Sequence, residues 1–286
     1  MTTGLKAEIE TLWERYTADE LDADRATTAD RDSLDILLTH LEAGRIRAAE
    51  PAEDGDTPPE RWRVNAWVKQ GILLNFALRE TQPREYGDVR YHDILPLRAT
   101  EDLLRRGTRN TPDGTTIRRG AYLGSNAIMM SPSFVNIGAY VDDGTLIDSC
   151  DTVGSCAQIG RNVKLGANTL IGGVLEPVED NPVIIEDDVA IGAGCRITSG
   201  FVIGEGCVIG ENTLLTPRIP VYDLVESEIY YGHVPAERRV FTRFVASQLG
   251  EHELFGESGA YKPAVVATDF GVDTRDATAR EDALRE

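Results

Sequence analysis

The sequence has few lysines and no long hydrophobic run. Only four of its 29 basic residues are lysines, and its 48 acidic residues give a net charge of −19. Such a charge repels nucleic-acid phosphates and anionic lipid, so a polyanion is a poor partner for this chain. No run of about 18 apolar residues is present, and the segment 1–12 lacks the basic start and apolar run of a signal peptide. We therefore expect a cytoplasmic protein that binds neither nucleic acid nor a membrane.

The excess of arginine over lysine has two explanations. An acidic, lysine-poor surface suits a salt-rich cytoplasm, where ions screen the repulsion between carboxylates. A genome whose base composition favours arginine codons would give the same bias. The sequence leaves both explanations open.

One pattern of six residues repeats along the middle of the chain. From Ile117 to Ile171 an aliphatic residue or Met leads every hexad, ten times in succession, and Gly often follows it. A small residue usually stands four places after the lead. The register breaks at GGVLEPVEDNPVI and resumes with six hexads, led by Ile185 through Leu215. A chance alignment of a β-rich segment does not give sixteen such repeats.

A period of six matches neither the 3.6 residues of an α-helical turn nor the alternation of a hairpin. It predicts short strands joined by tight corners, with each lead residue pointing inward. The pattern resembles the hexapeptide-repeat left-handed parallel β-helix, in which three hexads make one triangular coil and coils stack about 4.8 Å apart. We therefore predict a mainly β fold in which residues 107–219 form the β-helix. Residues 1–106 would form a helical N-terminal domain, and residues 220–286 a small C-terminal β/α region.

The flanking segments carry weaker signals. LKAEIETLWERY has an apolar face, SLDILLTHLEAG begins at the candidate cap Ser33 and ends before Gly44, and VNAWVKQGILLNFAL predicts a buried third helix. Residues 49–60 are rich in turn formers and predict a linker. After Leu215 we expect a few strands, and the polar tail from Thr268 predicts a terminal helix or a frayed end.

The chain is also poor in histidine and cysteine. The four histidines all lie outside the repeats: His40, His92, His233 and His252. A γ-type carbonic anhydrase needs three histidine zinc ligands on its coils, so that function is disfavoured, and we expect no metal site. Most hexapeptide-repeat acetyltransferases resemble one another in a coil-borne histidine base, which is also missing. The four cysteines lack Cys-x-x-Cys spacing, and we expect them to be reduced and buried.

Longer segments resemble the tetrahydrodipicolinate N-succinyltransferase family. They are VNIGAYVDDGTLIDSCDTVGSCAQIGRNVKLG, IGGVLEP and NPVIIEDDVAIGA, with VNAWVKQGILLNF, YHDILPL and RRGAY upstream and IYYGHVPA downstream. The resemblance covers about residues 5–245. It implies succinyl transfer from the cosubstrate succinyl-CoA to the amine of ring-opened tetrahydrodipicolinate in lysine (diaminopimelate) biosynthesis, with no permanently bound cofactor. It also implies a homotrimer with its sites between subunits.

The resemblance assigns roles to two residues of the acceptor site. Asp148, in GTLIDS, matches the catalytic and substrate-binding aspartate of the family. It follows the inward Ile147, so strand alternation predicts that it points outward. Arg109, in RRGTRNTP, matches the substrate-binding arginine. An acceptor with several carboxylates needs such cations, and the attacking amine needs a nearby group that manages its proton.

One segment departs from the family pattern. Many relatives carry an arginine and then an acidic residue where this chain reads IGAGCRITSG, so Gly194 replaces the arginine and Arg196 occupies the acidic position. Arg196 is predicted to point outward and to bind a substrate carboxylate, but it cannot act as a base. For the CoA arm we predict contacts with the corner Ser199–Gly200 and with Arg218. Two alternatives stay open: the same acceptor with acetyl-CoA as donor, and a noncatalytic hexapeptide-repeat scaffold.

Overall fold

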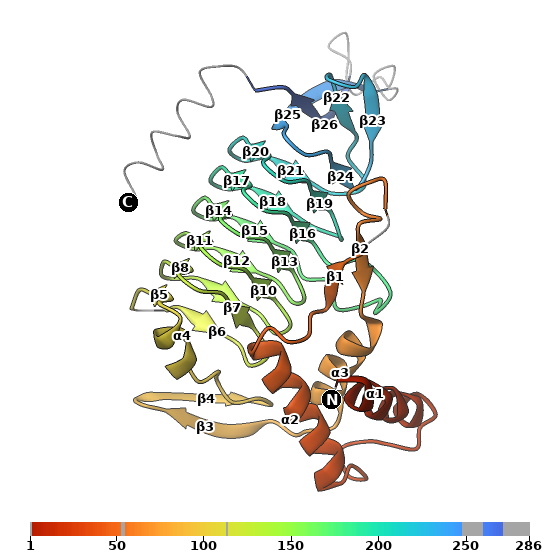
Figure 1. Cartoon of the computed structure of the whole chain (residues 1–286), viewed down its shortest axis with the longest axis vertical. Coiled ribbons are helices and arrows are strands. Elements are labelled where there is room, and N and C mark those ends of the chain that lie inside the picture. Colours follow the sequence, from red (N-terminus) through yellow and green to blue (C-terminus); the bar gives the residue numbers. More distant parts are fainter. Residues whose placement is uncertain (1, 53–54, 113, 248–259, 271–286) are drawn as a thin grey trace.

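A computed structural model describes residues 2–52, 55–112, 114–247 and 260–270 of the chain. Its main body is a parallel β-helix of stacked coils, which confirms the predicted fold class (Figure 1). Each regular coil contributes one two-residue strand to each of three faces. The parallel pairing links residues 18 apart, as between Tyr140 and Gln158. Three hexads therefore make one coil.

The three faces are named here in the order in which the chain meets them. Face A contains β5 (Arg109–Asn110), β8 (Ile128–Met129), β11 (Leu146–Ile147), β14 (Lys164–Leu165), β17 (Ala190–Ile191) and β20 (Val208–Ile209). Face B contains β6 (Thr116–Ile117), β9 (Phe134–Val135), β12 (Thr152–Val153), β15 (Leu170–Ile171), β18 (Arg196–Ile197) and β21 (Leu214–Leu215). Face C contains β7 (Tyr122–Leu123), β10 (Tyr140–Val141), β13 (Gln158–Ile159), β16 (Ile184–Ile185), β19 (Val202–Ile203) and β24 (His233–Val234).

The lead residues of all sixteen hexads fill the core of the β-helix, as predicted. None of them is more than 7% exposed, the highest value being that of Ile117 at the open end. Small residues stand four places after the lead because the corner leaves little room there, and Ala121 and Ala157 are fully buried. Asp151 is an exception, since it places a carboxyl group at this buried position.

The N-terminal region is helical in part. It contains α1 (Thr2–Thr17), α2 (Thr28–Glu42), α3 (Ala66–Ala77) and α4 (Glu101–Arg105), together with the hairpins β1 (Ala49–Pro51)–β2 (Trp62–Val64) and β3 (Gln82–Tyr86)–β4 (Val89–Asp93). The three longer helices were predicted and the two hairpins were not. Ser33 is not the cap of α2, because Thr27, six residues earlier, caps the helix and forms a capping box with Asp30.

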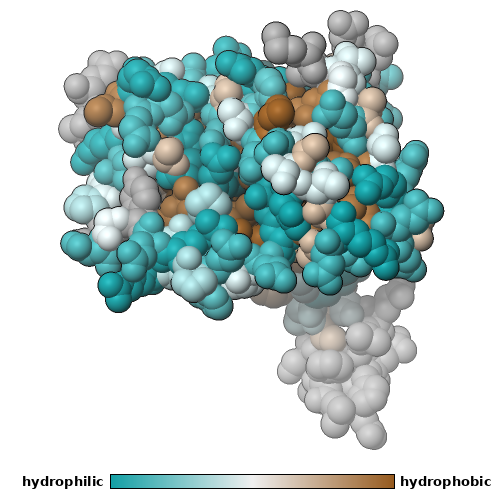
Figure 2. Space-filling model, turned by 90° about the horizontal axis from the view of Figure 1, so that it is seen from below, coloured by the Kyte–Doolittle hydropathy of each residue, from teal (hydrophilic) through white to brown (hydrophobic). Residues whose placement is uncertain are grey.

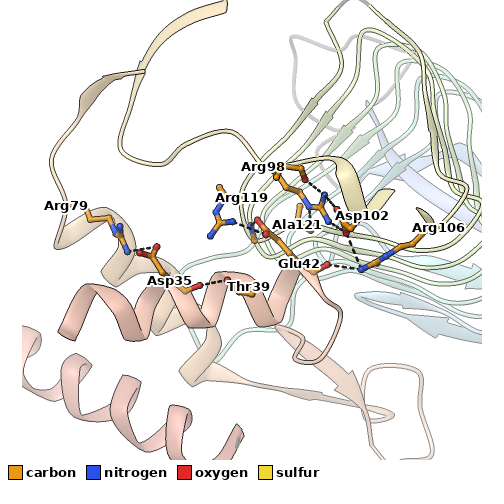
Figure 3. Close-up of polar contacts among 11 residues, drawn as sticks. Asp35, Thr39, Glu42, Arg79, Arg98, Asp102, Arg106, Arg119 and Ala121 are labelled. Carbon is orange, nitrogen blue, oxygen red and sulfur yellow. Dashed lines mark hydrogen bonds and ion pairs between the residues drawn. The ribbon is translucent and has the colours of Figure 1, made fainter. Parts of the chain in front are cut away.

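The N-terminal region packs against face C and the lower end of the β-helix (Figure 1). The Arg47 guanidinium lies 3.7 Å from the centre of the Tyr140 ring and donates to Gln158 at 2.9 Å. Glu42 at the end of α2 accepts hydrogen bonds from Arg119 at 3.0 Å and from the Gly120 amide at 2.9 Å (Figure 3). Viewed from this end, the surface is mainly hydrophilic (Figure 2). A polar outer face is what a cap on a solenoid requires.

The C-terminal strands extend the β-helix at its other end. The antiparallel pair β25 (Arg239–Ser247) and β26 (Ala260–Thr268) continues face A, and β22 (Val221–Asp223) and β23 (Glu228–Tyr230) join it. The predicted terminal helix or frayed end begins at Thr268 and lies mainly in residues 271–286, outside the described residues. The domain limits at residues 106 and 219 stay a prediction. None of the described helices is long and apolar enough to span a membrane.

Candidate functional site

Asp148 lies at the corner that leads from face A to face B. Strand β11 ends at Ile147, and Asp148 begins the corner that precedes β12. Its side chain is half-buried, and its Oδ1 atom accepts a hydrogen bond from the Ser149 amide at 2.7 Å. This contact stabilises the corner locally. The other carboxylate oxygen, Oδ2, takes no part in this contact.

Arg109 and Arg196 flank the same edge, but at different heights. Arg109 occupies the outward position of β5 on face A, two strands below β11. Arg196 occupies the outward position of β18 on face B, two strands above β12, and is exposed as predicted. Strands β5 and β18 are four coils apart. With about 4.8 Å between coils, the backbone positions of Arg109 and Arg196 are therefore about 19 Å apart along the coil axis. The structure does not bring Arg109, Asp148 and Arg196 into contact.

The Arg196 side chain is partly engaged with its own corner. Its Nη1 atom donates to the Gly194 carbonyl at 2.7 Å, and the outward neighbours on face B are the exposed Leu170 and Leu214. The guanidinium thus bends back toward position 194, where the family resemblance predicts an arginine. A two-residue shift along a strand keeps the same face and moves Cα by about 6–7 Å, which an arginine side chain can span.

A cavity of about 570 Å³ lies at the edge between faces B and C. It gathers Ser199, Gly200 and Arg218, the three residues predicted for the CoA arm. The other lining residues come from the same corner as Ser199, from the equivalent corner one coil earlier and from the segment that breaks the hexad register. They are Thr198, Gly172, Gly173, Val174, Glu176, Pro177, Asp180 and Asn181. The sequence analysis did not assign the register-breaking segment to a site. The break itself was the available signal, because it shows that the chain leaves the regular coil there.

Glycines let the backbone form the walls of this cavity. Gly200 has a φ of +71°, and a Cβ there would lie 2.5 Å from the Asn181 carbonyl oxygen. A Cβ on Gly173 would lie 2.6 Å from the Ser155 amide nitrogen. Neither position can accept a side chain without moving backbone. The 172–183 segment is therefore seated directly on the coils.

The cavity also has a charged rim. Arg218 is exposed and makes no ion pair with any residue in the described parts of the chain. Its planar guanidinium is suited to phosphate groups. Glu176 and Asp180 supply the opposite charge on the loop side. The cavity can therefore hold a ligand that has an anionic end and a polar, amide-rich arm.

Asp151 is a buried carboxyl group close to Asp148 that sequence reasoning did not single out. It is 1% exposed, its Oδ1 accepts from the Thr169 amide at 2.8 Å, and no described residue is a partner for its Oδ2. Burial raises the pKa of Asp151 to about 8. Ser133 joins the two aspartates, because its hydroxyl donates to the Asp148 carbonyl at 2.7 Å and accepts from the Asp151 amide at 3.2 Å.

The cysteines offer no nucleophile with an activating partner. All four are free thiols, and Cys156, Cys195 and Cys207 are buried as expected. Cys150 is the exception to the general expectation of burial: it is exposed, as its position in the hexad indicates, and it sits on the outside of a corner at a φ of +64°. Among the described residues, no group of three or more His, Cys, Asp or Glu side chains is arranged to hold a metal ion.

Comparison with known proteins gives matches to both the N-terminal region and the coils. The family model "Tetrahydrodipicolinate N-succinyltransferase N-terminal" matches residues 4–78, and "Bacterial transferase hexapeptide (six repeats)" matches residues 182–217. A curated relative from Dechloromonas aromatica (strain RCB) is 37% identical over 288 residues, covering 100% of both chains. One from Cupriavidus necator is 38% identical over 290 residues, covering 100% of this chain and 99% of the relative. Both relatives are named 2,3,4,5-tetrahydropyridine-2,6-dicarboxylate N-succinyltransferase.

Proposed function

Because this chain belongs to the tetrahydrodipicolinate N-succinyltransferase family, we infer that it is an acyltransferase that uses succinyl-CoA. It transfers the succinyl group to the amine of ring-opened tetrahydrodipicolinate and gives N-succinyl-2-amino-6-oxopimelate, a step of lysine (diaminopimelate) biosynthesis. The observation that carries this function is the similarity to relatives of that name along the whole chain.

The reaction forms one C–N bond and breaks one C–S bond. The acceptor amine attacks the thioester carbonyl, the amine loses a proton, and CoA leaves as the thiol. The enzyme must therefore orient the amine, take up its proton and stabilise the negative charge that develops on the carbonyl oxygen. We assign the first two tasks to Asp148, whose half-buried carboxylate uses only its Oδ1 atom in the contact with the Ser149 amide.

The acceptor carboxylates and the CoA arm need separate contacts. Arg109 and Arg196 are the cations on either side of the Asp148 edge, and a guanidinium binds a carboxylate with two parallel hydrogen bonds. At the other edge of face B, Ser199 and Gly200 offer main-chain groups to the CoA arm, and Arg218 offers a cation to its phosphates. No metal ion or permanently bound cofactor is needed for this chemistry.

A homotrimer would join these two half-sites. In one chain the Asp148 corner and the cavity at Ser199 lie on opposite edges of face B, a separation of up to about 20 Å for a six-residue hexad. Copies packed side by side would bring the cavity edge of one chain to the Asp148 edge of the next. The exposed Leu170 and Leu214 on face B favour such packing, because apolar side chains gain from leaving water. We also propose that the protein is cytoplasmic and binds neither nucleic acid nor a membrane.

The test is thiol release from succinyl-CoA and from acetyl-CoA, each with and without tetrahydrodipicolinate. We expect release from succinyl-CoA that depends on the acceptor. Preference for acetyl-CoA would replace the proposed donor. Absence of turnover, together with absence of CoA binding by calorimetry, would favour a noncatalytic scaffold instead.

A further inference from the structure

The loop 172–183, which we name the wall loop, has two sides. Its inner side lines the cavity through residues that include Asp180 and Asn181. Its outer side faces the N-terminal region, where Leu175 packs against the hydrophobic cluster of the helices. Val174 and Val178 are 8% and 7% exposed, so most of the loop's apolar surface is already covered. The position of the wall loop therefore depends on the helices as well as on the coils.

Lys69 on α3 makes the polar contact across this boundary. Its side chain is fully buried, and its Nζ atom donates to the Asp180 carbonyl at 2.5 Å. The next residue, Asn181, has its carbonyl packed against Gly200, the predicted CoA corner. A short chain of contacts therefore runs from the ammonium of Lys69, through two loop residues, to the cavity.

A buried ammonium is costly to keep. Removing a charge from water costs several kcal/mol unless the group is paired and its donors are satisfied. Burial lowers the pKa of Lys69, while the nearby Cys156 and Asp180 oppose that shift. The neighbours of Lys69 on α3 include the buried Val68 and Ile72, so an apolar side chain would fit this environment without that cost. The observed contact of the ammonium is with the wall loop.

We propose that Lys69 is a positioning residue that holds the wall loop in the shape that binds the acyl-CoA arm. This role rests on the proposed function, because it takes the cavity to be the CoA site. Lys69 touches neither reacting group in this arrangement. It acts through Asp180 and Asn181, so its loss should weaken donor binding more than it slows the chemical step.

The main experiment compares Lys69→Met with Asn75→Leu. Met keeps the length and packing of the side chain but removes the donor and the charge. Asn75 is also a fully buried polar residue of α3, but it bonds to Gly71 within the helix and lies about 120° around the helix from Lys69. We expect Lys69→Met to raise the KM for succinyl-CoA about 10-fold or more, with kcat and the KM for the acceptor changed less than about 3-fold. Asn75→Leu should leave all three constants near wild type.

Equal constants for Lys69→Met and wild type would overturn the proposal. A loss of kcat alone would also overturn it, because donor binding would then be unaffected. The same KM change in Asn75→Leu would overturn it too, because that result would indicate general damage to the fold. If Lys69→Met does not fold, Lys69→Gln is the second variant, because its neutral amide lies on a side chain one atom shorter and does not reach the Asp180 carbonyl in this geometry. In that variant hydrogen exchange of residues 174–183 should be faster than in wild type, and unchanged exchange would contradict the role.

Calorimetry with CoA alone separates this proposal from the function. Wild-type binding with a Kd at least about 10-fold weaker in the Lys69 variant supports both. Equal binding by wild type and variant removes the role of Lys69 and leaves the function standing. No binding by wild type overturns the cavity assignment, and the role of Lys69 with it.

Discussion

Replacing Asp151 with Asn should stabilise the protein, and the gain should grow with pH. The Asp151 carboxyl group has a pKa of about 8 in the folded chain because it is buried, against about 3.9 in an unfolded chain. Below pH 4 both states hold the proton and the group has no effect. Between pH 4 and pH 8 only the unfolded state ionises, so the folded state loses stability as pH rises.

The magnitude follows from the difference between the two pKa values. Each pH unit in this window costs about 1.4 kcal/mol, which gives about 4 kcal/mol at pH 7 and a plateau of about 5–6 kcal/mol above pH 8. Asn has the shape of the neutral acid and its oxygen can still accept from the Thr169 amide. The variant should therefore be the more stable protein at neutral pH, and its advantage should widen by about 2–3 kcal/mol between pH 5 and pH 7.

The assay is the free energy of unfolding in urea at fixed protein concentration, measured from pH 5 to pH 8.5. Asp102→Asn is the control of opposite sign. Burial alone would raise the pKa of Asp102. The hydrogen bonds and positive charge of Arg98, with the charge of Arg106, together have a larger effect, so the pKa lies below its usual value. The stabilising effect of Asp102 is fully present above the ordinary pKa of aspartate, so Asp102→Asn should be less stable than wild type by a constant amount from pH 5 to pH 8.5. An Asp151→Asn advantage that does not change with pH, or a loss of stability at pH 7, would refute this reasoning.

Three further outcomes test the site and the surface charge. Asp148→Asn should leave the assembly intact by light scattering but lower turnover about 10²-fold or more, and near-normal turnover would show that another group handles the amine proton. Arg196→Ala should raise the KM for the acceptor or for succinyl-CoA without changing assembly; unchanged constants would make Arg196 a solvated surface charge worth at most about 1 kcal/mol. The melting temperature should rise from dilute buffer to about 1 M KCl, because ions screen the repulsion within a chain of net charge −19. A flat or falling curve would leave codon bias as the explanation of the arginine excess.

The β-helix was predictable because its signal is local and repeated. Each lead residue, such as Ile147, is buried in the same way as the equivalent lead residue in the neighbouring coil. A wrong prediction at one hexad therefore does not change the prediction for the next. The hairpins β1–β2 and β3–β4 lack this redundancy. Pro51 and the turn-rich stretch up to Glu60 predict a turn whether or not the flanking strands pair. In the structure β1 and β2 do pair, and Trp62 of β2 donates from Nε1 to Glu186 on the β-helix at 3.1 Å, a contact that the local sequence does not reveal.

The cavity was predictable in part, for a related reason. Ser199, Gly200 and Arg218 occupy equivalent or adjacent corners of successive coils, so the repeat already places them on one edge. The wall loop follows no period, and its path is decided by contacts with α3, a helix about a hundred residues earlier in the chain. The residues proposed for the acceptor follow the repeat too, which is why Arg109, Asp148 and Arg196 lie near one edge. Their separations along the axis depend on the number of coils between them. A match to a family motif does not give that number.

Two buried ionisable side chains show what local patterns can and cannot reveal. Asp151 stands at the place of a hexad that otherwise holds a small residue, and Lys69 stands among the buried apolar residues of α3. Both break the pattern of their own segment, so the sequence marks them as costly positions. Their partners are Thr169 and the Asp180 carbonyl, which are 18 and 111 residues away, and only the fold brings these groups together. One exception lies beside the Asp148 corner and the other behind the wall of the cavity. Arg98 and Asp223 are buried as well, but each is held in an ion pair, with Asp102 and with Arg238. Asp151 and Lys69 have no ion pair among the described residues, so their burial is less well compensated, and each supports one of the two proposed half-sites.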